Sequence, residues 1–444
     1  MVRQKVVMPK EGISKEILLK KLEGAAEGDV DWKGGKIWSL VYHANDEHTD
    51  LLKVANSMYF SKNALSPMAF PSLQKFETEV VAMTIDMLNG DRKAVGSITS
   101  GGTESIILAI KTYRDWAKEK FPDIKEPEIV APSSAHPAFY KGAEYFNVKL
   151  IRVPVNKDTH RADVTAMRDA ITDNTILIVG SACDFPRGIV DPISDLGSIA
   201  HERGIGLHVD ACLGGFMLPF VRELGYSIPE FDFSVPGVTS ISADVHKYGY
   251  GGKGASIIMY RRESLWKHQF CVLTDWSGGI YISTTMRGTR PGGPIAAAWA
   301  SLKALGVSGY MKLAKIVMDA SEKLMEGIKK IPELFILGTP DMSVFSFASE
   351  EINIYQLGDV MDKKGWHLDR LQNPEALHMM VNPHHAKIID SFLNDLKAAV
   401  QEVKKSPEKS TAGQAAMYGM VASLPDKEKT KNYIINFLKS QYKL

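Results

Sequence analysis

The 444-residue sequence contains only three cysteines, Cys183, Cys212 and Cys271, which are widely spaced and form no CxxC pair. This scarcity argues against a disulfide framework and against a structural zinc site. We therefore expect a protein of a reducing compartment such as the cytoplasm, with no bound metal.

Long apolar runs and an excess of one charge are also lacking. The segment 1–24 has no continuous apolar stretch of the signal-peptide kind, and no later run approaches the roughly 20 apolar residues that span a bilayer. Lysine and arginine number 53 against 52 for aspartate and glutamate, so the net charge of +1 gives no electrostatic reason to propose nucleic acid or an anionic membrane as a partner. We expect a soluble chain with no transmembrane segment.

The order of apolar and polar residues predicts three regions. Residues 1–58 are charged and helix-prone, and we interpret them as an N-terminal helical arm. Over residues 59–306, apolar strands alternate with amphipathic helices, which predicts a large α/β domain with a mostly parallel central sheet flanked by helices. Residues 307–444 combine long helices with short strands, which predicts a smaller C-terminal α+β domain. The polar stretch 404–414 is expected to be a loop.

The most informative segment is SISADVHKYGYGGKG, residues 240–254. A strand-like start ends at Lys247, and the glycines and tyrosines that follow leave no helix to bury the lysine, so we expect Lys247 at the lip of a sheet. A lysine there can form a Schiff base with an aldehyde if desolvation or nearby cations lower its pKa, and His246 and Lys253 are candidate neighbours. A surface lysine in a turn is the alternative.

Asp210 ends the apolar run IGLHVD, residues 205–210. Open α/β sheets bind ligands beyond the carboxyl ends of their strands. An aspartate there can accept the N–H of a pyridinium ring and keep the ring protonated, so that it withdraws electrons. The alternative is a strand-end aspartate that caps the next helix.

A glycine-rich turn, SGGTES at residues 100–105, enters a predicted helix. Gly101 and Gly102 would let the backbone approach a phosphate, and the helix N-terminus and the Thr103 hydroxyl would supply donors. The same pattern is compatible with a simple capped helix start. It is neither a Walker A loop nor a GxGxxG fingerprint, which disfavours nucleotide binding.

His136 follows the predicted strand EIVAP and could stack on a flat ring and shuttle protons, or serve a structural role in its loop. The combination is more specific than any single motif. A phosphate cradle, a ring-stacking histidine, an aspartate for a ring nitrogen and a lysine arrive in that order at successive strand ends. These features match the requirements of pyridoxal phosphate and of little else.

Several segments resemble those of one known family: FPSLQKFETEVVAM, TSGGTESI, EIVAPSSAHPAF, HVDACLGGF, GVTSISADVHKYGY, TDWSGGIY and GTRPGG. They look like sphingosine-1-phosphate lyases, which form part of the group II decarboxylase branch of fold-type I pyridoxal-phosphate enzymes. The resemblance runs from about residue 45 to 440, and HVDACLGGF and SISADVHKYGY are specific to the lyases.

The resemblance implies a fold-type I pyridoxal-phosphate transferase fold, with Lys247 bonded to the cofactor, Asp210 at the ring nitrogen and His136 stacked on the ring. It implies a homodimer with shared sites and a small-molecule substrate. Further residues are expected at the cofactor and at the substrate: Gly101, Gly102, Thr103, His246 and the partner's Thr289 at the cofactor, and Asn63, Tyr248 and Lys253 at the substrate.

The sequence departs from the family pattern where the substrate phosphate is expected. The family usually has LHPDxFP where residues 65–71 read LSPMAFP, so a histidine near the phosphate end is Ser66. The family FPHG appears as FPRG at residues 185–188, and YGYAPKG appears as YGYGGKG. Arg187 could supply the cation that Ser66 lacks, or it could be a surface arginine.

The expected reaction is cleavage of the C2–C3 bond of a phosphorylated long-chain base, sphingosine or sphinganine 1-phosphate, to a fatty aldehyde and phosphoethanolamine. An amino-acid decarboxylase or another β-hydroxyamine aldolase is the alternative, because Arg187 or Arg290 could bind a carboxylate. A catalytically idle scaffold would have lost Lys247 or Asp210, and both are present. The general base stays open among Lys247, His136 and the cofactor phosphate, and Lys253 and Tyr248 are expected to bind the substrate phosphate.

Overall fold

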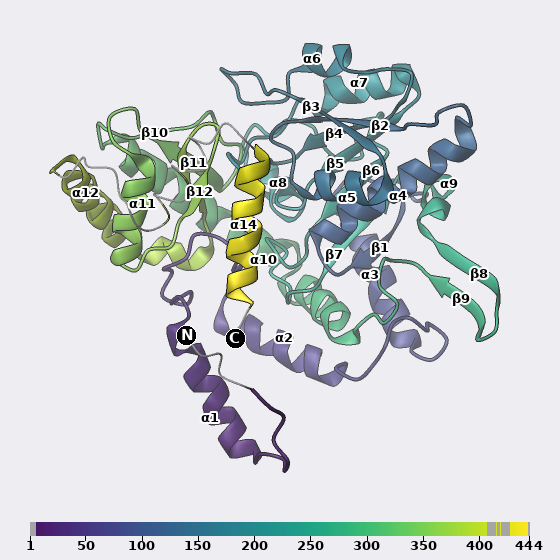
Figure 1. Cartoon of the computed structure of the whole chain (residues 1–444), viewed down its shortest axis with the longest axis horizontal. Helices are drawn as coiled ribbons and strands as arrows, with labels where there is room; N and C mark the ends of the chain where they lie inside the picture. The colour runs from purple at the N-terminus through teal and green to yellow at the C-terminus, as the bar shows by residue number, and fades with distance from the viewer. Residues whose placement is uncertain (1–5, 406–413, 415–417, 419–426, 443–444) are drawn as a thin grey trace.

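The computed structural model describes residues 6–405, 414, 418 and 427–442, so most of the loop predicted at 404–414 lies outside the described residues. A seven-stranded sheet with the order β1-β7-β6-β5-β4-β2-β3 forms the centre of the large domain (Figure 1). Its strands are β1 (Val95–Thr99), β2 (Glu128–Pro132), β3 (Lys149–Val153), β4 (Thr175–Ser181), β5 (Gly206–Asp210), β6 (Ser240–Ala243) and β7 (Ser256–Tyr260).

The sheet is mostly parallel, as the sequence predicts. Strands β2 to β6 pair in parallel, whereas β7 runs antiparallel to both of its neighbours, β1 and β6. Strands β2 and β4 are buried along their whole length, which is why EIVAP and TILIVGS read as continuous apolar runs rather than as alternating ones.

Helices cover both faces of this sheet (Figure 1). Helices α4 and α5 pack with one face around Ile129 and Val179, and α3 and α7 pack with the other face around Val130 and Ile178. The helices of this region are α3 (Pro71–Met87), α4 (Gly102–Lys120), α5 (Ala138–Phe146), α6 (Val164–Asp169), α7 (Ile193–Arg203), α8 (Leu218–Glu223) and α9 (Glu263–Trp266), with the short 3-10 helices η2 (Gly214–Phe216) and η3 (Lys267–Gln269).

A long helix, α10 (Gly292–Lys329), leads to a second, smaller sheet with the order β10-β11-β13-β12. Gly306 interrupts α10 with non-helical angles (φ 55°, ψ −179°), and the proposed division between the large and small domains falls at this residue. The elements of the smaller unit are β10 (Phe335–Ile336), β11 (Val344–Ala348), α11 (Ile354–Lys363), β12 (Asp369–Leu371), β13 (Ala376–Met380), η4 (Pro383–Lys387), α12 (Ile389–Lys405) and α14 (Lys427–Gln441).

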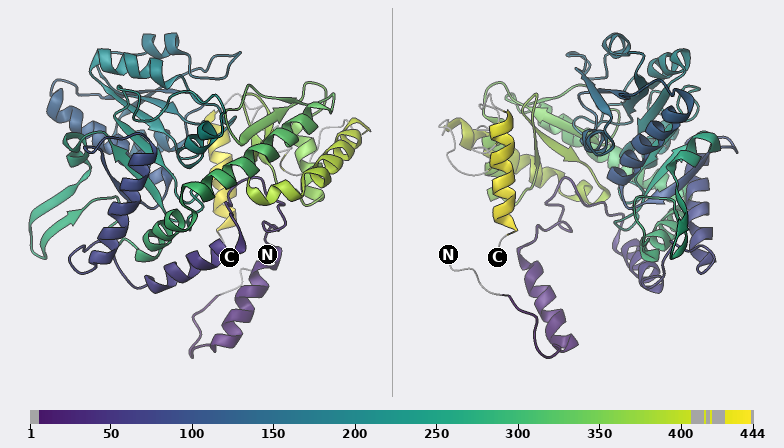
Figure 2. Two further views of the ribbon diagram at one scale, coloured as in Figure 1. Left: turned by 180° about the vertical axis from the view of Figure 1, so that it is seen from behind. Right: turned by 45° about the vertical axis from the view of Figure 1, so that its right-hand side comes forward.

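Two elements project from the body of the molecule. Helix α1 (Lys15–Ala25), continued by η1 (Ala26–Gly28), extends away from the rest of the chain and buries no side chain (Figures 1 and 2). Strands β8 (Cys271–Trp276) and β9 (Gly279–Ser283) form an isolated hairpin that the sequence analysis did not predict. In the described part of the chain, no helix is both long enough and apolar enough to cross a membrane.

The N-terminal region that we expected to form a separate arm is only partly detached. Helix α2 (Asp46–Met58) lies against α10, where Leu52 packs with Ala297 and Ala300. The boundary at residue 58 therefore stays a proposal.

Candidate active site

A cavity of about 390 Å³ opens where β4, β5 and β6 end and helix α4 begins. Because parallel strands end at the same edge of the sheet, residues far apart in the sequence meet there. Those expected at the cofactor in this chain line the cavity together: Gly101, Gly102, Thr103, His136, Asp210, His246 and Lys247.

Lys247 follows β6, and its Nζ atom lies 3.0 Å from Oδ2 of Asp244. Burial lowers the pKa of the Lys247 ammonium, but the Asp244 carboxylate, together with the more distant Cys212, Tyr42 and Asp210, outweighs burial, and the pKa is raised above its usual value. The lowered pKa that the sequence analysis set as a condition for Schiff-base formation is therefore not found in this structure. Sequence reasoning missed Asp244, although its place three residues before the lysine is a usable signal.

Asp210 ends β5, and its carboxylate is held by the turn that follows the strand and by the neighbouring strand β6. Its Oδ1 atom accepts hydrogen bonds from the Cys212 backbone N–H at 3.1 Å and from the Ser242 hydroxyl at 3.3 Å. These bonds fix the orientation of the carboxylate in the cavity. Burial raises the pKa of the Cys212 thiol far above its usual value, so this lining group stays a neutral thiol.

His136 lies in the loop between β2 and α5, where its Nδ1 atom accepts a hydrogen bond from the Ala138 backbone N–H at 3.1 Å. Burial lowers the pKa of the imidazole, and Asp210 opposes this shift only in part. The ring is therefore neutral near pH 7, and with Nδ1 accepting, the proton is assigned to Nε2.

The turn into α4 forms a cradle suited to an anion. The first backbone N–H groups of the helix lack partners within the helix, and the helix dipole favours negative charge there. A side chain at Gly102 would bring its Cβ atom to 2.7 Å from Oδ2 of Asp244 and to 2.8 Å from Sγ of Cys212. The position therefore requires glycine to keep the cradle open.

Two buried polar atoms beside the cavity lack hydrogen-bond partners among the described residues: Oδ1 of Asp244 and Nδ1 of His246. Such atoms are costly unless a bound group satisfies them. Together with the Lys247 amine, the Asp210 carboxylate and the anion cradle, they fit pyridoxal phosphate. Lys247 would bond its aldehyde, Asp210 would face its ring nitrogen, and the start of α4 would hold its phosphate.

Lys253 and Tyr248 lie outside this lining. The Nζ atom of Lys253 donates to the backbone carbonyl of Leu40 at 2.6 Å and lies 5.1 Å from the centre of the Tyr42 ring. Lys253 is exposed to solvent, yet partial burial of its ammonium and the nearby charge of Lys247 lower its pKa to about 8. Tyr42, which sequence reasoning missed, joins this region to Tyr248, with ring centroids 5.1 Å apart.

Tyr248 does not present its hydroxyl to the cavity. The side chain is fully buried, and the hydroxyl donates to the Val381 carbonyl at 3.0 Å and accepts from the Ser343 hydroxyl at 2.9 Å. The expected substrate contact is thus replaced by bonds that join the large domain to the smaller sheet. The order of apolar and polar residues in SISADVHKYGY does not indicate which of these side chains faces the cavity.

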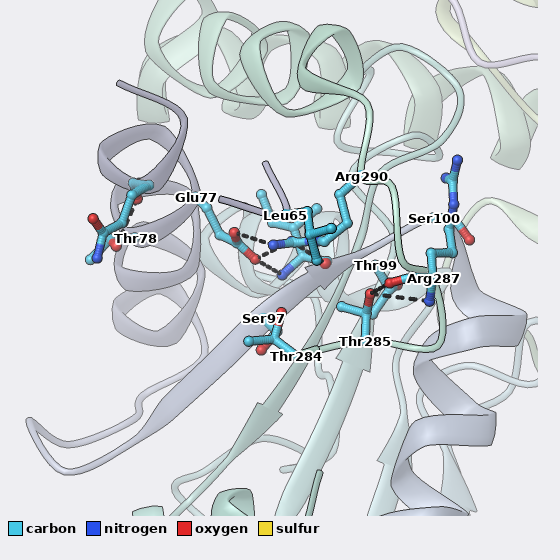
Figure 3. Close-up of polar contacts among 12 residues, drawn as sticks. Leu65, Glu77, Thr78, Ser97, Thr99, Ser100, Thr284, Thr285, Arg287 and Arg290 are labelled. Carbon is cyan, nitrogen blue, oxygen red and sulfur yellow. Dashed lines mark hydrogen bonds and ion pairs between the residues drawn. The ribbon is translucent and has the colours of Figure 1, made fainter. Parts of the chain in front are cut away.

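Arg187 and Arg290 are both buried in ion pairs. Arg187 lies 3.5 Å from Asp184 and donates to the backbone carbonyl of Asn373 at 3.3 Å, so it is neither a surface arginine nor a cavity cation. Arg290 makes a two-point contact with the Glu77 carboxylate, at 2.5 and 2.9 Å (Figure 3).

The remaining predicted residues lie apart from the cavity. Asn63 accepts hydrogen bonds at Oδ1 from the backbone N–H groups of Leu65 and Arg290, each at 3.0 Å. Ser66 lines a separate, largely apolar cavity of about 970 Å³ beside α3 and the β8–β9 hairpin. Thr289 is exposed on the single chain.

The lining also contains residues that sequence reasoning did not select: Ser100, Glu104, Ile106, Ser181, Cys183, Phe185, Cys212, Leu213 and Asp244. Most of them flank a predicted residue or end a strand already assigned to this edge.

The fold and this site define an enzyme of the fold-type I pyridoxal-phosphate class. A family model for the pyridoxal-dependent decarboxylase conserved domain matches residues 34–350. The structure of a sphingosine-1-phosphate lyase from Burkholderia pseudomallei is similar with a TM-score of 0.87 and 39% identity, covering 96% of this chain and 98% of that one. A glutamate decarboxylase from Lactobacillus brevis shares the fold at 19% identity, with a TM-score of 0.79 and coverage of 91% and 96%.

The relatives found by sequence comparison narrow the family further. The sphingosine-1-phosphate lyase of Arabidopsis thaliana is 47% identical over 98% of this chain and 81% of its own length, and that of Rattus norvegicus is 43% identical over 98% and 77%. The chain belongs to the pyridoxal-dependent decarboxylase family and, within it, to the sphingosine-1-phosphate lyases. Its cofactor is pyridoxal phosphate.

Proposed function

We propose that this chain is a carbon-carbon lyase that cleaves the C2–C3 bond of a phosphorylated long-chain base, giving a fatty aldehyde and phosphoethanolamine. The state of the two candidate arginines carries this choice over amino-acid decarboxylation. Arg187 is buried beside Asp184, Arg290 pairs with Glu77, and neither guanidinium lines the cofactor cavity, where a substrate carboxylate would have to be bound. The names of the relatives at 36–47% identity support the same reaction.

The bound cofactor supplies an electron-withdrawing ring joined to the substrate amine, which weakens the bonds at C2. The chain must then take the proton from the C3 hydroxyl so that C3 becomes the aldehyde carbon. Lys247 is our candidate base, because the Asp244 carboxylate raises its pKa and so makes its neutral amine a strong proton acceptor. Neutral His136, with its proton assigned to Nε2, is better suited to stacking and donating.

Lys253 is our candidate for the substrate phosphate. Its pKa of about 8 leaves most molecules charged near pH 7, and the hydrogen bond that it makes within the described residues goes to a neutral carbonyl. A phosphate dianion would give this ammonium a charged partner in a partly dehydrated place. Ser66 and Tyr248 are weaker candidates, because one lines another cavity and the other has its hydroxyl bonded within the protein.

We further propose a homodimer with shared sites. The support is that the single chain leaves Thr289 exposed and also leaves apolar side chains uncovered on α1 and, separately, on the hairpin: Ile17, Leu18, Leu19, Leu22, Val272, Leu273, Trp276, Ile280 and Ile282. A cytoplasmic location is proposed on the presence of three free cysteines.

The test is to incubate the purified, cofactor-loaded protein with sphinganine 1-phosphate, with sphinganine, and with a panel of amino acids. Release of long-chain aldehyde and of carbon dioxide is measured in each case. We expect aldehyde from the phosphorylated base, and at least about tenfold less from the base without phosphate because one charge-assisted contact is lost. If an amino acid releases carbon dioxide and neither base releases aldehyde, the chain is a decarboxylase and the lyase proposal is wrong.

A further inference from the structure

The segment 285–291, which carries Thr289, is bound to the body of the chain by two carboxylates, one half-buried and one buried. The first is Glu77 on α3. Its two oxygens bind the Arg290 guanidinium at 2.5 and 2.9 Å, and Oε1 also accepts from the Ile98 backbone N–H at 2.9 Å (Figure 3). Arg290 in turn donates to the Ile98 carbonyl at 2.9 Å, so one end of the segment is fixed to strand β1.

The second carboxylate is Glu104, in the first turn of α4. Its Oε1 atom accepts from the Met286 backbone N–H at 3.0 Å, and its Oε2 atom accepts from the Ser100 backbone N–H at 2.6 Å. The side chain is only 8% exposed and lines the cofactor cavity. One carboxylate therefore ties the start of the segment to the turn that cradles the phosphate.

A negative charge in this turn works against binding a phosphate. Glu104 repels the anion, and it occupies the Ser100 N–H, which lies in the turn itself. A capping role for α4 would account for the bond to Ser100. It does not account for the bond to Met286, 182 residues further along the chain. The bond to Met286 therefore indicates that Glu104 has a role beyond capping helix α4.

We propose that Glu77 and Glu104 are positioning residues that couple the phosphate cradle to the segment 285–291 of the same chain. Strand β1 leads from Ile98 directly into the cradle, so both carboxylates act on the same short stretch of backbone. An anion that holds the turn into α4 in one conformation therefore also holds the segment 285–291 in one conformation. With respect to the shared dimer sites the inference rests on the proposed function. If Thr289 reaches the partner's cofactor, occupancy of one site favours binding at the other.

The test measures amide hydrogen exchange of peptides that cover residues 95–104 and 284–291, with and without pyridoxal phosphate, in the full-length protein. Wild type, Glu104→Gln and Glu77→Gln are compared, with Glu79→Gln as the matched control. Glu79 lies on the same helix but bonds Trp299 and Lys303 instead. The second readout is the cofactor dissociation constant, from an absorbance titration.

In wild type and in Glu79→Gln, we expect the cofactor to slow exchange in both peptides. In Glu104→Gln we expect the cofactor still to slow exchange in residues 95–104, apart from the Ser100 N–H that bonds Glu104, whereas the cofactor-dependent protection of residues 284–291 falls about tenfold, the size of one lost charge-assisted hydrogen bond. Equal protection of the segment in all variants would overturn the proposal. So would a wild-type segment whose exchange ignores the cofactor.

Glu77→Gln leaves Arg290 buried without its ion pair, and the protein could lose its fold for that reason alone. A double variant, Glu77→Gln with Arg290→Gln, removes both charges and is screened by circular dichroism before exchange is measured. Folded protein with uncoupled peptides supports the proposal, and folded protein with coupled peptides contradicts it. Because no substrate is added, failure of the lyase assay does not affect this result.

Discussion

At the scale of single residues, the pairing of Lys247 with Asp244 decides how the cofactor attaches. The ion pair holds the lysine as an ammonium, since Asp244 and its neighbours raise the lysine pKa despite burial. Attack on an aldehyde needs the neutral amine. Lys247 must therefore give up its proton before it could bond the cofactor aldehyde.

We expect borohydride reduction of the cofactor-loaded protein to leave a pyridoxyl group on Lys247, because this amine lines the cavity beside Asp210 and the α4 cradle. Peptide mapping by mass spectrometry locates the adduct, and Lys247→Ala should carry none. An adduct on Lys253, whose pKa is lower, would overturn the assignment.

Asp210→Asn should retain the cofactor but lose turnover. An amide cannot keep a ring nitrogen protonated as a carboxylate does, although it can still accept the hydrogen bond from the Cys212 N–H. We expect kcat to fall by about 10²- to 10³-fold, the usual cost of losing one preorganised electrostatic contact. Absorbance measures whether the cofactor is retained, and aldehyde release measures the loss in kcat. Near wild-type turnover would remove the electron-sink argument.

Lys253 gives the clearest pH dependence. Burial and Lys247 lower its pKa to about 8, so the ammonium is present below that pH and is lost as the pH rises through it. If it binds the substrate phosphate, kcat/KM should decline above about pH 8, because kcat/KM reports the free enzyme. In Lys253→Ala we expect kcat/KM to fall by about 10- to 100-fold and this decline to vanish. A decline that persists in the variant would assign it to another group.

At the scale of elements, the sequence predicts most of what is local and apolar. The predicted strand EIVAP forms as β2, and the apolar run IGLHVD forms β5 within a residue of its bounds, because an uninterrupted apolar run between turn residues is typical of a buried strand in an α/β domain. The β8–β9 hairpin escapes this reasoning. Its apolar residues, such as Val272 and Ile280, are exposed on the single chain, so no burial pattern distinguishes it.

The candidate site, too, is predictable only in its local features. Strand ends can be recognised in the sequence, so Asp210 and Lys247 could be placed together from the sequence alone. The direction of a side chain after a strand depends on turn geometry, and this is why Tyr248 points into the protein and not into the cavity. Ion pairs such as Arg290 with Glu77 join residues more than 200 positions apart, which no local pattern indicates.

The start of helix α4 can be tested as an element. Gly102→Ala would place a Cβ atom 2.7 Å from Oδ2 of Asp244, which must shift the carboxylate or the helix start. We expect the cofactor dissociation constant to rise by about tenfold or more, the scale of one displaced charge-assisted contact. Gly24→Ala, at a helical position with open space around it, serves as the control. Unchanged affinity in Gly102→Ala would mean that this turn does not hold the phosphate.

At the scale of the whole molecule, the single chain leaves apolar surface uncovered. Helix α1 buries no side chain, and a two-stranded hairpin such as β8–β9 is at best marginally stable alone. Both project from the body (Figures 1 and 2). The segment 285–291 follows the hairpin directly, so a second copy that covers the hairpin would also meet Thr289.

We therefore expect inactive subunits to complement each other. Lys247→Ala removes the cofactor lysine of its own site, and Thr289→Ala removes a contact offered to the partner's site. In a mixed dimer, one of the two sites would combine an intact Lys247 with an intact partner's Thr289. Co-expression with two different affinity tags isolates this hybrid, and aldehyde release should recover to roughly half of the wild-type rate because one site in two is whole. Thr289→Val, which keeps the shape without the hydroxyl, distinguishes loss of a hydrogen bond from loss of packing. Full activity in a species shown by light scattering to be a monomer, or no recovery in a purified hybrid, would contradict shared sites.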